Sequence, residues 1–180
     1  MTLILLTSLL AGTLRDFDCS SQQGLRFQQY IAPEIFVCDK DIEVYIPFAL
    51  DYWKAHGHTL NFDKSKKCLG KVAGNPGYGE IIIRLDQKKI EEVEEKANLS
   101  IAAYTTVYSS NIDSFSIYGA EVTFGENDVI HDENSLNVID LNYLTMTHEI
   151  GHALGYLHVD KGCVGHIMNP YLYYVGLSFK

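Results

Sequence analysis

The chain is poor in positive charge and has no long apolar segment. Its 180 residues include 14 Lys and Arg against 23 Asp and Glu, which gives a formal net charge of -9. No basic cluster offsets this balance, so we expect no nucleic-acid partner, because an acidic surface repels phosphate groups. The longest apolar run has about a dozen residues, whereas a helix needs roughly twenty to cross a bilayer. We therefore expect no stable membrane span.

Repeats and low-complexity stretches are also lacking, so nothing in the sequence indicates more than one folded unit. A chain of 180 residues with 47% hydrophobic content is long enough to enclose one core. We therefore expect one folded domain over residues 19–180, preceded by a separate segment at residues 1–18.

The N-terminal segment begins with an apolar run of signal-peptide length, residues 1–14, with small residues at Ala11 and Gly12. No Lys or Arg precedes this run, although signal peptides usually begin with such a charge. Residues 1–18 are therefore either a signal peptide or an N-terminal arm with a buried strand. We favour the signal peptide, which predicts a secreted or extracellular protein.

The most informative segment is residues 148–158, which read HEIGHALGYLH. His148 and His152 are four residues apart, so on an α-helix both side chains project from one face, close enough to bind one ion. Gly155 can adopt the left-handed conformation that ends a helix and turns the chain, which brings His158 towards the same ion. Three neutral imidazoles with one open position are the ligand set of a catalytic Zn²⁺. The segment therefore predicts one catalytic zinc ion.

Taken singly, each histidine is more often an ordinary surface or core residue than a metal ligand. The pattern H-E-x-x-H-x-x-G-x-x-H fixes five positions, and a chance match in a chain of this length has odds on the order of one in ten thousand. Glu149, beside the first ligand, is then the candidate general base.

This pattern resembles the signature of the metzincin zinc endopeptidases, which continues with a methionine turn. Met168 follows His158 within the sequence GHIMNP and is similar to the methionine of that turn. A lone Met is more often core filler, but its place after the third histidine favours the Met-turn. Within this clan the likeness is greatest to the matrixins, and it extends over about residues 41–173.

The resemblance implies an α+β, zincin-like fold: a twisted, mixed and mostly parallel five-strand sheet, a zinc-binding helix behind the cleft, and a C-terminal subdomain that contains the Met-turn. That subdomain must be small, because only twelve residues follow Met168. The zinc helix is expected to begin near Asp140, an acceptable N-cap. From the resemblance and from apolar periodicity, we expect strands at 41–47, 59–62, 80–85, 99–106 and 120–124, a helix at 48–56, and a surface helix at 88–97.

The chain departs from the matrixins at several points. Val159 follows the third histidine where matrixins usually have Ser, so the metzincin subfamily stays open. Residues 86–130 contain no histidine, so we expect no second, structural zinc, and no Pro-Arg-Cys-Gly latency sequence is present. The acidic stretch 125–134 offers oxygen ligands for Ca²⁺, but at loop spacing it is equally well a solvated turn.

None of the four cysteines belongs to a CxxC metal pair. An even number favours disulfides in an oxidising compartment, and three pairings can be drawn. The strands implied by the resemblance place Cys38 just before the first strand and Cys68 shortly after the second. We therefore expect Cys38 to pair with Cys68, and Cys19 with Cys163. Four reduced, buried thiols are the alternative.

These features predict a zinc-dependent endopeptidase that hydrolyses peptide bonds through a metal-activated water. By resemblance, a protein or peptide substrate lies extended along residues 99–104, and Pro170, Tyr171 and Tyr173 form the wall of a pocket for the residue after the cut. We expect that residue to be apolar. The sequence leaves the natural substrate and the oligomeric state open.

Two alternative functions would use the same zinc site. One is a zinc-stabilised structural or binding module, such as a surface or particle component, and the other is a zinc hydrolase of cell-wall peptides. Glu149 argues against the first, because a structural site has no use for this carboxylate.

Overall fold

The computed structural model describes residues 19–20, 26–27, 32–66, 68, 71, 74–109, 116–126, 136–163 and 165–170. The segment 1–18, the two pocket residues Tyr171 and Tyr173, and residues 127–134 of the acidic stretch lie outside the described residues. The expectations for the signal peptide, the pocket wall and Ca²⁺ therefore stay predictions.

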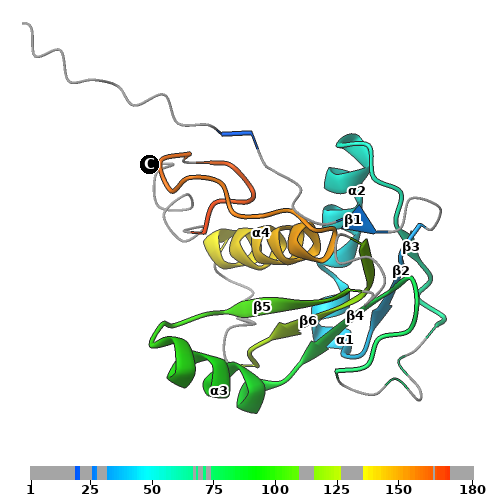
Figure 1. Cartoon of the computed structure of the whole chain (residues 1–180), viewed down its shortest axis with the longest axis horizontal. Coiled ribbons are helices and arrows are strands. Elements are labelled where there is room, and N and C mark those ends of the chain that lie inside the picture. Colours follow the sequence, from blue (N-terminus) through cyan, green and yellow to red (C-terminus); the bar gives the residue numbers. More distant parts are fainter. Residues whose placement is uncertain are drawn as a thin grey trace, which may run out of the picture.

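One mixed sheet forms the centre of the fold (Figure 1). Its strands are β1 Arg26–Phe27, β2 Glu34–Val37, β3 Asn61–Phe62, β4 Glu80–Leu85, β5 Ala103–Ser109 and β6 Ser116–Phe124. Their order is β1-β6-β4-β2-β3, and β5 also pairs with β6. Every pairing is parallel except that of β5 with β6. Apart from the two-residue β1, this is the mixed, mostly parallel five-strand sheet that the sequence predicts.

Helices lie on both faces of the sheet, and the α+β class is confirmed. They are α1 Lys40–Glu43, α2 Ile46–Ala55, α3 Gln87–Ala97 and α4 Leu136–Ala153. Helix α4 crosses one face next to α2, and α3 lies on the other side of β5 and β6 (Figure 1). The main apolar core lies between the sheet, α2 and α4, and includes Ile81, Val122, Met146 and Ile150.

The strand predicted at residues 41–47 is wrong, because α1 and α2 occupy this segment. A strand would place Ile42, Val44 and Ile46 on one face, since side chains alternate along it. In the structure Ile42, Ile46 and Ala49 are fully buried, whereas Val44 is 53% exposed. The buried positions are therefore three to four residues apart, which is the spacing of a helix.

Two further features explain why residues 41–47 are helical and why the strand forms earlier, at β2. Pro47 is in the first turn of α2, where its missing N–H leaves no helical hydrogen bond unmade. The strand that does form is β2, in which both Ile35 and Phe36 are buried. A parallel strand covered on both faces has a continuous apolar run instead of an alternating pattern.

Helix α4 begins at Leu136, one turn before the N-cap expected near Asp140, so that boundary is also wrong. Asp140 lies inside the helix. No Pro or Gly lies between Leu136 and Asp140 to stop the helix, and a residue type suited to a cap does not by itself end one.

The other expected elements form, some with shifted bounds. Strand β4 has the predicted bounds, and the surface helix α3 begins one residue earlier than expected. Asp86 caps α3 by accepting a hydrogen bond from the N–H of Lys89 at 3.0 Å, and Asn98 ends it in the left-handed conformation, with φ 53°. Ile90 is the buried residue of this surface helix.

Two disulfides join the predicted pairs, Cys38 with Cys68 and Cys19 with Cys163. They are typical of proteins that fold in an oxidising compartment. Among the described residues, none of the helices has the length and apolar character needed to cross a membrane.

Candidate metal centre

The end of α4 presents two histidines, and a tight turn brings in a third. His148 and His152 lie one turn apart on the helix, which ends at Ala153. Gly155 has φ 92°, and its N–H bonds to the carbonyl of His152 at 2.8 Å, while the next N–H, of Tyr156, reaches the carbonyl of Gly151 at 2.9 Å. This pair of bonds is the Schellman arrangement, which requires a left-handed residue at the Gly155 position. The chain then reverses and returns to the site.

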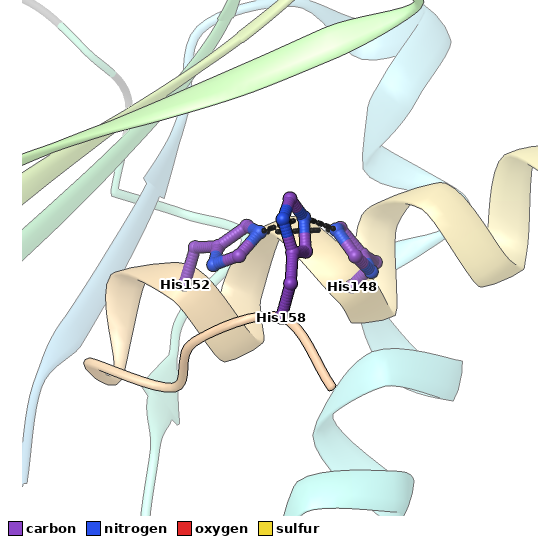
Figure 2. Close-up of side chains that lie close together, drawn as sticks. All are labelled: His148, His152 and His158. Atoms are coloured by element: carbon purple, nitrogen blue, oxygen red, sulfur yellow. Dashed lines mark hydrogen bonds between the residues drawn. The ribbon is translucent and has the colours of Figure 1, made fainter. Parts of the chain in front are cut away.

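The three imidazoles converge on one point (Figure 2). The Nε2 atom of His148 lies 3.0 Å from that of His152 and 3.2 Å from that of His158, and the Nε2 atoms of His152 and His158 are 3.0 Å apart. Three nitrogens that each bind a tetrahedral Zn²⁺ at 2.0 to 2.1 Å would be about 3.3 Å from one another. The spacing in the structure is close to that value.

Hydrogen bonds of the Nδ1 atoms determine which ring nitrogen of His148 and His152 faces the centre. Nδ1 of His148 lies 2.6 Å from the carbonyl oxygen of Ile167, and Nδ1 of His152 lies 2.7 Å from that of Tyr156. A carbonyl oxygen only accepts, so both Nδ1 atoms carry the proton and both Nε2 atoms present lone pairs. Lone pairs at this distance repel unless a cation lies between them. The three residues therefore fit a metal ion.

Burial keeps these imidazoles in the form that binds metal. It lowers the pKa of His148 to about 3, with a smaller effect from the charge of the neighbouring His152. Burial also lowers the pKa of His152 to about 4, and it lowers the pKa of His158. The metal-free rings are therefore neutral at pH 7, so a metal ion does not have to compete with protons there.

Met168 packs close to α4, where its Sδ lies 2.5 Å from the place that a Cβ of Gly151 would take, and the Met-turn stays a prediction. Met168 is fully buried, and its carbonyl accepts the N–H of Val159, the residue after the third histidine, at 3.0 Å. Asn169 is also buried, and its Nδ2 donates to the carbonyl of Cys163 at 2.9 Å. These two bonds hold the loop between His158 and Met168.

Glu149 lies beside the histidines, with only 5% of its surface exposed. Burial raises the pKa of its carboxyl group to about 7, against a smaller lowering by a hydrogen bond from Thr105. That bond joins Thr105 Oγ1 to Glu149 Oε2 at 2.6 Å. A buried carboxylate with a pKa near neutrality can both accept and release a proton at physiological pH.

A cleft of about 460 Å³ opens over the histidines and Glu149. One wall is the segment from Ser100 to Thr105, which overlaps the expected substrate strand at residues 99–104, and Pro170 lies on the cleft surface. Leu157, beside the third histidine, lines the cleft and is 54% exposed, and Val93, Ile101 and Val107 also line it. The described part of the cleft is therefore mainly apolar apart from the residues of the centre.

The structure also shows residues that sequence reasoning did not single out. They are Thr105 on β5, Thr145 on α4, which lines the cleft, and the carbonyl groups of Ile167 and Tyr156, which orient two ligands. Their roles depend on tertiary contacts or on backbone atoms, which no local pattern of residue types marks.

No protein-family model, no curated protein and no solved structure matches the chain. Its function therefore has to be argued from the chemistry of the site itself.

Proposed function

We propose that the chain is a zinc-dependent endopeptidase of metzincin type, most similar to the matrixins. The observation that carries the proposal is the combination of three converging imidazoles with a buried carboxylate at an open cleft. A structural site needs the ligands only, and burying Glu149 beside it would lower stability without adding a ligand to the site. An endopeptidase uses all three features.

The three histidines and Glu149 would have separate roles in hydrolysis. His148, His152 and His158 would hold the ion. A bound Zn²⁺ would supply Lewis-acid activation of the attacking water and of the scissile carbonyl. Glu149 would accept the proton of that water and deliver it to the leaving amine, because its carboxylate lies buried at the cleft beside the three histidines.

The free edge of β5 supports a peptide as the substrate. Among the described strands, β5 pairs only with β6, so its other edge has unpaired backbone groups beside the cleft. An extended peptide can add to such an edge as a further strand, held by backbone hydrogen bonds. The apolar cleft favours Leu, Met, Phe or Tyr after the scissile bond, and Pro170 with Tyr171 and Tyr173 would complete the pocket.

The proposed location is extracellular. The two disulfides support an oxidising compartment. Residues 1–18 would then act as the export signal.

Parallel digestion of denatured casein and purified peptidoglycan tests the proposal. We expect the wild type, loaded with zinc, to cut casein at apolar residues and to leave peptidoglycan intact. Glu149→Gln should bind zinc equally and lose activity by about 10² to 10⁴-fold, because only the proton acceptor is removed. Cleavage of peptidoglycan alone would indicate a cell-wall hydrolase, and no cleavage of either by the zinc-loaded protein would overturn the enzyme proposal.

A further inference from the structure

The carboxylate of Glu149 is held by a residue from another element. Among the described residues, Thr105 on β5 is the one side chain that hydrogen-bonds to it, from Oγ1 to Oε2 at 2.6 Å. This length is in the range of a hydroxyl bonded to a charged carboxylate, which is stronger than a neutral hydrogen bond. The same Oγ1 lies 3.0 Å from the main-chain carbonyl oxygen of Glu149. The hydroxyl is therefore close to both the backbone and the tip of this side chain.

The strand geometry explains why Thr105 points towards α4. Side chains alternate along β5, and Ala103 and Val107, two residues away on either side, pack against the core between the sheet and α4. Tyr104 faces the opposite side, where the amine of Lys89 lies 5.9 Å from the centre of its ring. Thr105 is thus a polar side chain on the apolar face of the strand.

Thr105 bonds to one oxygen of the Glu149 carboxylate, so the other oxygen can take part in proton transfer. In the described part of the chain, no group hydrogen-bonds to Oε1 of Glu149. A glutamate side chain has three rotatable bonds, and a carboxylate that moves among several rotamers would meet the attacking water in only some of them. A bond to Oε2 restricts those rotamers while Oε1 stays available.

We propose that Thr105 is a positioning residue, which holds Glu149 Oε2 so that Oε1 takes part in proton transfer. The inference rests on the proposed function of Glu149 as general base. Thr105 also belongs to the strand whose free edge would bind the peptide. The base and the substrate are therefore positioned by the same strand.

Kinetics of three variants test the proposal on the casein-derived peptide that the wild type cuts. Thr105→Val keeps the shape and removes the hydroxyl, so kcat should fall about 10- to 100-fold while KM changes by less than about twofold. Thr105→Ser retains a hydroxyl and should recover most of kcat. Thr106→Val, the next residue on β5 and on its opposite face, is the control and should resemble the wild type. Unchanged kcat in Thr105→Val would overturn the inference, as would an equal loss in Thr105→Ser.

Crystal structures of the zinc-loaded wild type and Thr105→Val provide a measurement that does not need activity. We expect the Glu149 carboxylate in one position in the wild type and in a different or split position in the variant. If the wild type cuts no substrate, the endopeptidase proposal fails and this comparison still decides the role of Thr105. An unmoved carboxylate in Thr105→Val would overturn that role. If the valine variant does not fold, Thr105→Ala serves in both experiments.

Discussion

Gly151 lies between His148 and His152 in α4, and the side chains packed against it leave no room for a Cβ. A Cβ at this position would be 2.5 Å from Sδ of Met168 and 2.5 Å from Cζ2 of Trp53. Trp53 is fixed in place, because its Nε1 donates to the carbonyl of Thr147 at 2.8 Å. The missing side chain therefore lets Trp53 and Met168 pack directly against the turn of α4 that contains His148 and His152.

Gly151→Ala is expected to destabilise the protein. Alanine gains about 1 kcal/mol over glycine inside a helix, but overpacking a rigid core costs about 1 to 3 kcal/mol. The rigid indole cannot move aside easily, so the overpacking cost lies in the upper part of this range, at about 2 to 3 kcal/mol. After the gain of about 1 kcal/mol, the net loss in the free energy of unfolding is about 1 to 2 kcal/mol. Urea denaturation followed by the fluorescence of Trp53, the single tryptophan, measures it. A variant as stable as the wild type would contradict this account of the packing.

A second prediction at residue scale concerns the cost of burying Glu149. In the metal-free protein its pKa is raised from 4.5 to about 7, so the folded state holds a proton that the unfolded state has already released. Stability is therefore lost as the pH rises from 4.5 to 7, and the loss is complete above that. Glu149→Gln avoids this loss, so its stability relative to the wild type should rise over the same range by on the order of 3 kcal/mol.

Urea denaturation of both metal-free proteins between pH 4.5 and 8 checks this prediction. The histidines are present in both proteins, so their titration largely cancels in the difference. A stability difference that stays constant with pH, or that shrinks as the pH rises, would show that Glu149 is not buried as described.

At the scale of elements, the turn after α4 brings His158 to the other two histidines. Gly155 needs a left-handed conformation, with φ 92°, to form the turn. Gly57, after α2, has a similar φ of 85°, and no atom lies within 4 Å of where its Cβ would be. A side chain at either glycine would therefore meet the same backbone strain, but only Gly155 lies next to the three histidines.

Replacing either glycine by alanine should cost about 1 to 2 kcal/mol of stability, because a side chain disfavours this conformation. Only Gly155→Ala should also weaken zinc binding, by roughly tenfold or more, since it shifts the turn that carries His158 and the carbonyl that orients His152. Competition with a chromophoric chelator measures the affinity. Equal zinc affinities in the two variants would show that the turn at Gly155 does not position the zinc ligands.

The elements also show which features can be read from sequence. The clustering of the three histidines and the turn at Gly155 were predicted correctly, because they lie within one helix and the turn that follows, where spacing along the chain fixes geometry. Residues 41–47 were assigned wrongly, because apolar residues at both alternate and helical spacings fit two periods at once. Thr105 was not predicted, because it is 44 residues from Glu149 and meets it only through the packing of β5 on α4.

At the scale of the whole molecule, two disulfides close loops of very different size. The Cys19–Cys163 pair spans 144 residues and joins Cys19 to the loop before Met168, whereas Cys38–Cys68 spans 30 residues. A longer loop removes more conformational entropy from the unfolded chain.

Removal of the longer crosslink should therefore be the more destabilising change. In the loop-entropy model, the Cys19→Ala and Cys163→Ala double variant loses about 1 kcal/mol more of the free energy of unfolding than the matched variant at Cys38 and Cys68. Urea denaturation of both variants gives the comparison. A larger loss for the shorter loop would indicate that native-state contacts, rather than chain entropy, dominate the contribution of these crosslinks.

The central claim is that one zinc ion, held by the three histidines, makes this protein a peptidase. Titration of metal-free protein with zinc, with peptide cleavage followed at each addition, tests it most directly. We predict that activity rises linearly and levels off at one zinc per chain, and that His158→Ala needs far more zinc, because one of three protein ligands is lost. Cleavage that does not depend on zinc, or a protein that binds one zinc and still cuts no peptide, would contradict the claim.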